Sequence, residues 1–261
     1  MSQRRIFCTR HFTATTYMIT PLALLVLAAV ACSGPADSQP PKATDGPRLK
    51  ADVEVFDFGF VPQDAIVSHT FWLKNSGTAP AHIDKLVPNC GCTQVPPTDS
   101  IVKVGDSLPV EILFGTRGML GPVEKFVRIM SNAVGRVPAL TIRATAVKAG
   151  ELPPGATITP AHVRIGKGSS AHEATVSIEN TGKGKLAFHT VEAPEPWIRV
   201  NPKEFALSPG EKTAVQVKVQ RGTGDKFTKS ITWEASGDSL ARFTLPISDS
   251  IAAVGAGAAT H

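Results

Sequence analysis

Apolar and polar residues alternate with a period of two along much of the chain after residue 50. This alternation places every second side chain on one face of an extended strand, as in a half-buried β-sheet. Turn-forming segments such as Asn-Ser-Gly at 75–77 and Ser-Pro-Gly at 208–210 separate the runs. No helical period is present in this region, so the pattern predicts an all-β fold. The clearest alternating sets are His69, Phe71, Leu73; Val110, Ile112, Phe114; Leu140, Ile142, Ala144; Val215, Val217, Val219; and Phe243, Leu245, Ile247.

The alternating pattern occurs twice along the chain. Asn75 and Asn180 follow similar strand sequences and lie 105 positions apart, as do Gly105 and Gly210. A repeat of this length indicates a duplicated domain rather than a short solenoid unit. About seven short strands in roughly 100 residues is typical of a β-sandwich. We therefore expect two tandem immunoglobulin-like β-sandwiches.

Changes in composition suggest where these domains begin and end. We expect the first sandwich at residues 51–148, a proline-containing linker at 149–157 and the second sandwich at 158–250. Residues 32–50 have four prolines and almost no large apolar side chains, which predicts a disordered tether. The Ala/Gly-rich end of the chain, residues 251–261, is expected to be a disordered tail.

The first 31 residues have the organisation of a signal peptide. A basic stretch precedes an apolar run at 21–31, which is shorter than the roughly 18 residues of a membrane span. Ala29 and Ala31 before Cys32 resemble the lipobox of bacterial lipoproteins. This resemblance implies that the Cys32 thiol is acylated, with palmitate as the expected lipid, and that Cys32 becomes the new N-terminus. The alternative is an ordinary secretory peptide that is cleaved near Ala31.

The leader also decides which partners and which location we expect. Of the net charge of +5, three positive charges (Arg4, Arg5 and Arg10) lie in the leader, so no basic footprint for nucleic acid remains. The membrane is the expected partner through the lipid anchor, together with a protein of the envelope. Ser33 rather than Asp follows the cysteine. The resemblance to bacterial lipoproteins, in which Asp at this position implies retention in the inner membrane, therefore favours the outer membrane, with the domains in the periplasm or on the cell surface.

Three segments of the first domain resemble a known family. They are Phe-Asp-Phe-Gly at 56–59, the strand and turn at 67–77, and Pro-Asn-Cys-Gly-Cys-Thr at 88–93. Together they resemble the bacterial "domain of unknown function 1573" family, which is similar to Hydin-type and major-sperm-protein-type immunoglobulin-like domains. The resemblance covers about residues 51–148 and implies a sandwich of seven or eight strands without an assigned activity.

Cys90 and Cys92 are the candidate reactive residues. Exported thiols meet an oxidising compartment, which favours a Cys90–Cys92 disulfide, structural or redox-labile. Thiolates also select soft metals, so a Cu(I) site is an alternative, with His82 as a further candidate ligand. Two free thiols, or bridges to a partner, are the third interpretation. We expect Gly91 to supply the unusual backbone conformation that joining residues i and i+2 requires.

The second copy of the domain indicates that the cysteines serve the first domain alone. At the offset of 105 residues, Glu195-Pro196-Trp197 aligns with Cys90-Gly91-Cys92, so the sandwich folds without the cysteines. No nucleophile elbow, zinc-protease or phosphate-loop motif is present in the sequence. We expect a non-enzymatic binding or scaffold module without a cofactor. The alternative is a thiol-redox or copper-handling accessory protein that uses Cys90 and Cys92.

Overall fold

The structure is a computed structural model that describes residues 45–148, 155–165, 172–191, 195–220, 226–237 and 241–249. All of them belong to one compact unit that spans residues 43–261. The predicted signal peptide, Cys32, most of the predicted tether and the predicted tail at 251–261 lie outside the described residues. Within the described ranges, no helix is long and apolar enough to cross a membrane.

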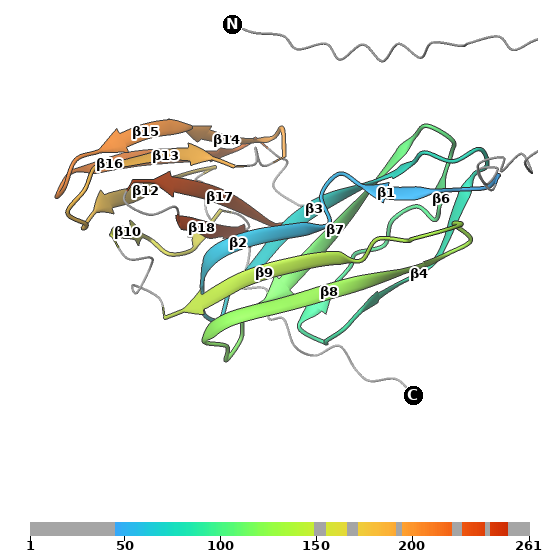
Figure 1. Cartoon of the computed structure of the whole chain (residues 1–261). Helices are drawn as coiled ribbons and strands as arrows, with labels where there is room; N and C mark the ends of the chain where they lie inside the picture. The colour runs from blue at the N-terminus through green and yellow to red at the C-terminus, as the bar shows by residue number, and fades with distance from the viewer. Residues whose placement is uncertain are drawn as a thin grey trace, which may run out of the picture. The chain divides into compact units, whose positions relative to one another are not determined.

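The predicted all-β, immunoglobulin-like fold class is confirmed, because the described residues form strands and no helix (Figure 1). We call the described residues 45–148 the N-terminal repeat and the described residues between 155 and 249 the C-terminal repeat. The strands of the N-terminal repeat are β1 (Leu49–Ala51), β2 (Val55–Pro62), β3 (Ile66–Asn75), β4 (Ala81–Pro88), β5 (Thr93–Gln94), β6 (Ile101–Val102), β7 (Ser107–Gly115), β8 (Gly121–Ser131) and β9 (Leu140–Val147). Those of the C-terminal repeat are β10 (Ala156–Thr159), β11 (Val163–Arg164), β12 (Glu173–Asn180), β13 (Leu186–Thr190), β14 (Ile198–Asn201), β15 (Glu204–Leu207), β16 (Lys212–Val219), β17 (Thr228–Ser236) and β18 (Ala241–Ser248).

The two repeats have the same strand order. One sheet runs β1-β3-β7-β5 in the N-terminal repeat and β10-β12-β16-β14 in the C-terminal repeat. The other strands of the N-terminal repeat are ordered β2-β9-β8-β4-β6, and those of the C-terminal repeat are ordered β11-β18-β17-β13-β15. The inward-facing residues of the alternating pattern form a separate buried cluster in each repeat. His69, which follows the apolar side of its strand, is buried and stacks on Phe56 with a ring-centroid distance of 3.6 Å.

A buried asparagine closes the same corner in each repeat. Asn75 Nδ2 donates to the carbonyl oxygens of Ala79 at 2.8 Å and Val102 at 2.9 Å, and Asn75 Oδ1 accepts from the backbone N–H of Gly77 at 3.0 Å. Asn180 makes the corresponding bonds to Gly184, Leu207 and Gly182 at 2.8, 2.9 and 2.9 Å. Both side chains are fully buried. Because buried polar groups need partners, each asparagine satisfies backbone groups both in the turn that follows it and in a separate strand.

Two of the expected boundaries are wrong by a few residues. The tether was expected to reach residue 50, but β1 begins at Leu49, whose side chain is buried. The backbone N–H of Arg48 donates to Asn75 Oδ1 at 3.1 Å, so the corner asparagine fixes the segment just before β1. The linker was expected to reach residue 157, but β10 begins at Ala156 and pairs with β12. Tertiary hydrogen bonds order these short segments, although their composition is typical of linkers.

The repeats meet where β18 lies beside β2 (Figure 1). Phe243 of β18 pairs in parallel with Phe60 of β2, and Thr244 Oγ1 donates to the Phe58 carbonyl oxygen at 2.7 Å in a buried position. Gly59 lies between these contacts with φ at +64°, and a Cβ at Gly59 would be 2.1 Å from the Arg242 carbonyl oxygen. We call this contact the Gly59 seam. Only a residue without a side chain allows the two backbones to approach this closely.

We predict that Asn75→Ala and Asn180→Ala each lower the free energy of unfolding by roughly 2–4 kcal/mol, because each removes three or more hydrogen bonds and leaves buried carbonyls without a donor. Urea unfolding followed by circular dichroism measures this change. Ser76→Ala, at the exposed neighbouring position, is the matched control and should shift stability by less than about 0.5 kcal/mol. Equal midpoints for Asn75→Ala and Ser76→Ala would contradict the structural role of the corner.

We predict that Gly59→Ala separates the repeats at the seam. Gly118→Ala is the matched control, because Gly118 has a φ of +66° but no atom within 4 Å of its Cβ position. Both variants carry the backbone strain of a positive φ, roughly 1–3 kcal/mol, but only Gly59→Ala adds the clash with Arg242. Small-angle X-ray scattering should show a larger radius of gyration for Gly59→Ala alone. The seam is not needed for docking if both variants scatter like the wild type.

Candidate functional site

Cys90 and Cys92 lie in the turn between β4 and β5, where the chain crosses from one sheet of the N-terminal repeat to the other. The structure joins the two sulfur atoms in a disulfide, with the Cα atoms 5.3 Å apart. On a fully extended strand this separation would be about 6.6 Å, so the backbone bends between the cysteines. The Thr93 N–H donates to the Cys90 carbonyl oxygen at 3.3 Å and closes the turn. Both cysteines are half-buried, and Gly91 between them is exposed.

The role that we expected for Gly91 is wrong. Gly91 is not among the glycines with positive φ, and a Cβ at this position would have no atom within 4 Å. The bend between the cysteines therefore uses a backbone conformation that other residues also adopt. Nothing in the packing around residue 91 requires a glycine.

His82 is not brought to the cysteines. It lies near the start of β4, and the cysteines follow the end of that strand at Pro88. Six residues of extended strand separate His82 from Pro88 by about 20 Å. Among the described residues, no three His, Cys, Asp or Glu side chains converge as a metal site would require. A Cu(I) ion at Cys90 and Cys92 would need prior reduction of the disulfide, since thiolates are the ligands.

The same turn forms in the C-terminal repeat without cysteines. The Ile198 N–H donates to the Glu195 carbonyl oxygen at 2.8 Å, as the Thr93 N–H does to Cys90. The Gln220 N–H donates to the Trp197 carbonyl oxygen at 2.7 Å, and the Gly115 N–H donates to Cys92 at 2.8 Å in the equivalent bond. These bonds match the alignment of Glu195 with Cys90 and of Trp197 with Cys92. The turn is thus a property of the sandwich, and its side chains are free to differ.

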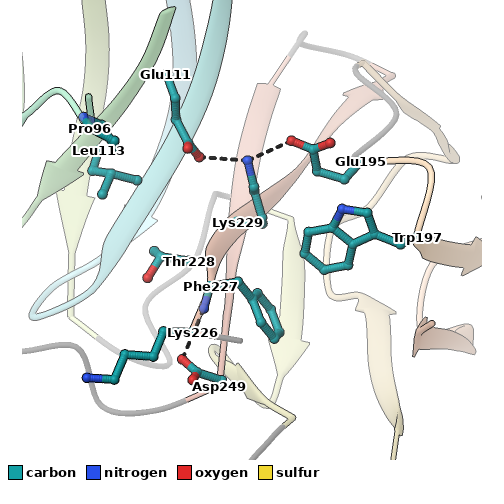
Figure 2. Close-up of a pocket in the computed structure, with 10 residues that line it drawn as sticks. All are labelled: Pro96, Glu111, Leu113, Glu195, Trp197, Lys226, Phe227, Thr228, Lys229 and Asp249. Atoms are coloured by element: carbon teal, nitrogen blue, oxygen red, sulfur yellow. Dashed lines mark hydrogen bonds and ion pairs between the residues drawn. The ribbon is translucent and has the colours of Figure 1, made fainter. Parts of the chain in front are cut away.

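The Glu195–Trp197 turn lines a cleft of about 730 Å³ between the two repeats (Figure 2). We call it the inter-repeat cleft. Its wall from the N-terminal repeat consists of Pro96, Glu111 and Leu113. The wall from the C-terminal repeat consists of Glu195, Trp197, Lys226, Phe227, Thr228, Lys229 and Asp249. The cleft exists because the repeats are docked, since neither wall alone encloses it.

Lys229 of β17 lies between two carboxylates that come from different repeats. Its Nζ donates to Glu111 Oε1 at 2.8 Å and to Glu195 Oε1 at 2.7 Å (Figure 2). Burial by itself favours the neutral amine, but the hydrogen bonds and charges of both glutamates outweigh it, so the pKa of Lys229 is raised above its ordinary value. Lys229 therefore stays protonated at neutral pH and links the repeats through Glu111.

Aromatic side chains stand beside this ion triad. Trp197 and Phe227 meet edge to face with ring centroids 5.2 Å apart. The Phe227 N–H donates to Asp249 Oδ1 at 3.3 Å, which holds the start of β17 against the end of β18. The cleft thus combines a fixed charged centre with a rigid aromatic wall. This combination is common in binding sites, where a few placed polar groups orient a ligand against apolar walls.

Little in the sequence predicts this cleft. Glu111 and Lys229 are 118 positions apart, and each lies on a strand whose polar residues are expected to face solvent. The alignment of Glu195-Pro196-Trp197 with the cysteine motif was the one available signal. It marked the turn as a place where the repeats differ, but it did not show that this turn faces the other repeat.

The fold and the shared turn define a protein of the immunoglobulin-like β-sandwich class. Residues 49–146 match the family described as "Protein of unknown function (DUF1573)", and residues 158–248 match the "HYDIN/CFA65/VesB-like, Ig-like domain". The resemblance recognised in the sequence is therefore confirmed. No curated protein has a matching sequence.

Several solved structures are similar to this chain. A protein of unknown function from Porphyromonas gingivalis has 13% identity and a TM-score of 0.32, with 77% of this chain and 99% of that chain covered. The secreted serine protease VesC from Vibrio cholerae has 13% identity and a TM-score of 0.33, with 77% and 51% covered. WR4, a C. elegans member of the MSP family, has 10% identity and a TM-score of 0.32, with 38% and 100% covered. Neither an activity nor a partner follows from these likenesses.

We predict that Cys90→Ser/Cys92→Ser costs at most about 1–2 kcal/mol of unfolding free energy, because a disulfide between residues i and i+2 removes little entropy from the unfolded chain. Urea unfolding of the double variant and of the oxidised wild type measures the difference. Gly91→Ala, which keeps both cysteines, should retain the disulfide and the wild-type stability. A loss above about 3 kcal/mol, typical of a 15-residue loop, would show that the disulfide holds more than its own turn.

Proposed function

We propose that this protein is a non-enzymatic binding module of the bacterial cell envelope and that the inter-repeat cleft is its binding surface. One observation carries the proposal: both repeats contribute walls to a cleft whose charged centre and aromatic side are held in place. A binding site benefits from such preorganisation, because fixed side chains lose little conformational entropy when a partner arrives.

The state of the charged groups supports binding rather than catalysis. A general base or nucleophile needs a pKa near the working pH. Lys229 has the opposite shift, since Glu111 and Glu195 stabilise its ammonium form. Each glutamate in turn holds that ammonium through one oxygen. The triad is thus suited to orient a partner and to fix the repeats.

The envelope location in this proposal rests on the leader sequence. Acylation of Cys32 would tether the repeats to the outer membrane, with the cleft in the periplasm or at the cell surface. The partner would then be another envelope protein. The membrane itself would be engaged through the lipid alone.

The alternative function, thiol-redox or copper handling, depends on Cys90 and Cys92. The exposed position of Gly91 leaves the disulfide turn accessible to another thiol. The two proposals predict different results for the cysteine double variant. A partner that binds in the cleft should be captured equally well by the wild type and by Cys90→Ser/Cys92→Ser, whereas a redox partner should be lost from the double variant.

We predict that a photo-cross-linking amino acid at Lys226 captures a discrete partner in the native envelope. Lys212 is the matched control position, because it is also an exposed lysine but lies at the opposite end of β16 from Val219 and the cleft. The adduct should form at Lys226, should be absent at Lys212, and should disappear in Gly59→Ala, which separates the cleft walls. Cys32→Ser should lower its yield if the lipid brings the repeats to the partner. Equal labelling at both lysines would rule out the cleft as the binding surface.

A further inference from the structure

An exposed aromatic and proline surface continues from the inter-repeat cleft along β3 and β7. Leu73 and Val110 face the core, so their neighbours Trp72 and Pro109 face outward. Trp72 pairs with Pro109 in the register of the two strands, and Trp72 is 47% exposed. An exposed tryptophan ring beside an exposed proline offers apolar contact area to a partner, and tryptophan is enriched at protein interfaces.

The C-terminal repeat covers only one end of this sheet face. The Ser68 N–H donates to Ser230 Oγ at 2.8 Å, and Lys229 reaches Glu111 at 2.8 Å, so β17 lies over this end. The other end, with Trp72 and Pro109, stays open. Pro109, Glu111 and Leu113 point to the same side of β7 at intervals of about 6.6 Å. We call the surface from Trp72 and Pro109 through Glu111 and Leu113 to Trp197 the sheet track.

The centre of the sheet track has an excess of negative charge. Glu111 and Glu195 share the single ammonium group of Lys229, and each uses Oε1 for this contact. The second oxygen of each carboxylate takes no part in the contact with Lys229. These oxygens are therefore acceptors for a second cation, at a place where Trp197 lies nearby (Figure 2).

We infer that the sheet track binds an extended, arginine-bearing segment of a partner protein, with the guanidinium group at Glu111 and Glu195 and the apolar side chains two positions before and after it on Trp72 and Trp197. The inference rests on the proposed function of the cleft. A guanidinium group binds carboxylate oxygens through paired N–H donors and also stacks on aromatic rings. The distance from Pro109 to Leu113, about 13 Å, matches four extended residues of a partner and exceeds the reach of a small organic cation.

Synthetic peptides of the sequence Gly-Phe-Ser-Xaa-Ser-Phe-Gly test this inference, with Arg, citrulline or Glu as the central residue, because residues two positions apart share one face of an extended segment. Citrulline keeps the shape of arginine and removes its charge. Fluorescence anisotropy with the mature full-length protein gives the Kd of each peptide. We expect the arginine peptide to bind at least about tenfold more tightly than the citrulline peptide, and this preference should fall in high salt.

Three variants assign the binding to the sheet track. Glu111→Gln keeps an oxygen for Lys229 but removes a charge, so the arginine preference should fall to about threefold or less. Trp72→Ala removes an exposed ring outside the ion triad and should weaken the arginine and citrulline peptides alike, by roughly tenfold. Glu124→Gln, at an exposed carboxylate that pairs with Arg143 elsewhere on the N-terminal repeat, is the control and should leave every Kd unchanged.

Each outcome either supports or overturns the inference. Equal affinity for the arginine and citrulline peptides, an unchanged preference in Glu111→Gln, or no binding of the arginine peptide at about 1 mM overturns it. A scattering profile of Glu111→Gln that matches the wild type shows that the repeats remain docked. The proposed function fails separately, through the cross-linking at Lys226, so a captured partner without arginine preference would leave the cleft as a binding surface and reject the sheet track.

Discussion

The missing side chain at Gly59 is the constraint on which the arrangement of the two repeats depends. A Cβ at this position would be 2.1 Å from the Arg242 carbonyl oxygen, so only glycine lets β2 and β18 lie side by side. Thr244 then reaches the Phe58 carbonyl oxygen, and β17 comes to lie over the outer face of β3 and β7. The contact between Lys229 and Glu111, and with it the inter-repeat cleft, follows from this docking. The absence of a side chain at Gly59 thus allows the inter-repeat cleft, which neither repeat forms alone.

The two repeats share backbone contacts but carry different side chains at the same turn. Asn75 and Asn180 make the same buried contacts and close the same corner of each repeat. The turn at Cys90 and at Glu195 also keeps its backbone hydrogen bonds. The side chains of this turn differ between the repeats, because backbone hydrogen bonds alone close the turn. In the N-terminal repeat the turn carries a disulfide, and in the C-terminal repeat it carries the charge and the ring that face the other repeat.

The candidate site was only partly predictable from the sequence. Cys90 and Cys92 could be singled out, because two cysteines have few uses in a chain that the sequence predicts to be exported, and their spacing limits the geometry. The unusual backbone conformation expected at Gly91 was wrong, because a two-residue spacing does not reveal which φ the intervening residue adopts. His82 could not be placed, because its distance from the cysteines depends on where β4 begins and ends. Lys229 and Glu111 gave no signal, because charged residues on the outer face of a strand normally face solvent. Glu195 was marked only through its alignment with Cys90.

The sequence by itself determined the all-β class, the internal repeat, the family that the N-terminal repeat resembles and the turns at Asn75 and Asn180. These are local properties, because the period of two in the strands and the chemistry of the turns depend on residues that are close in the sequence. The tertiary structure alone decided which faces of the two repeats meet and which charges pair across 118 positions. It also decided that residues 45–50 fold against Asn75, although their composition is that of a tether. Such contacts depend on the positions of several strands at once, and no local pattern along the chain encodes them.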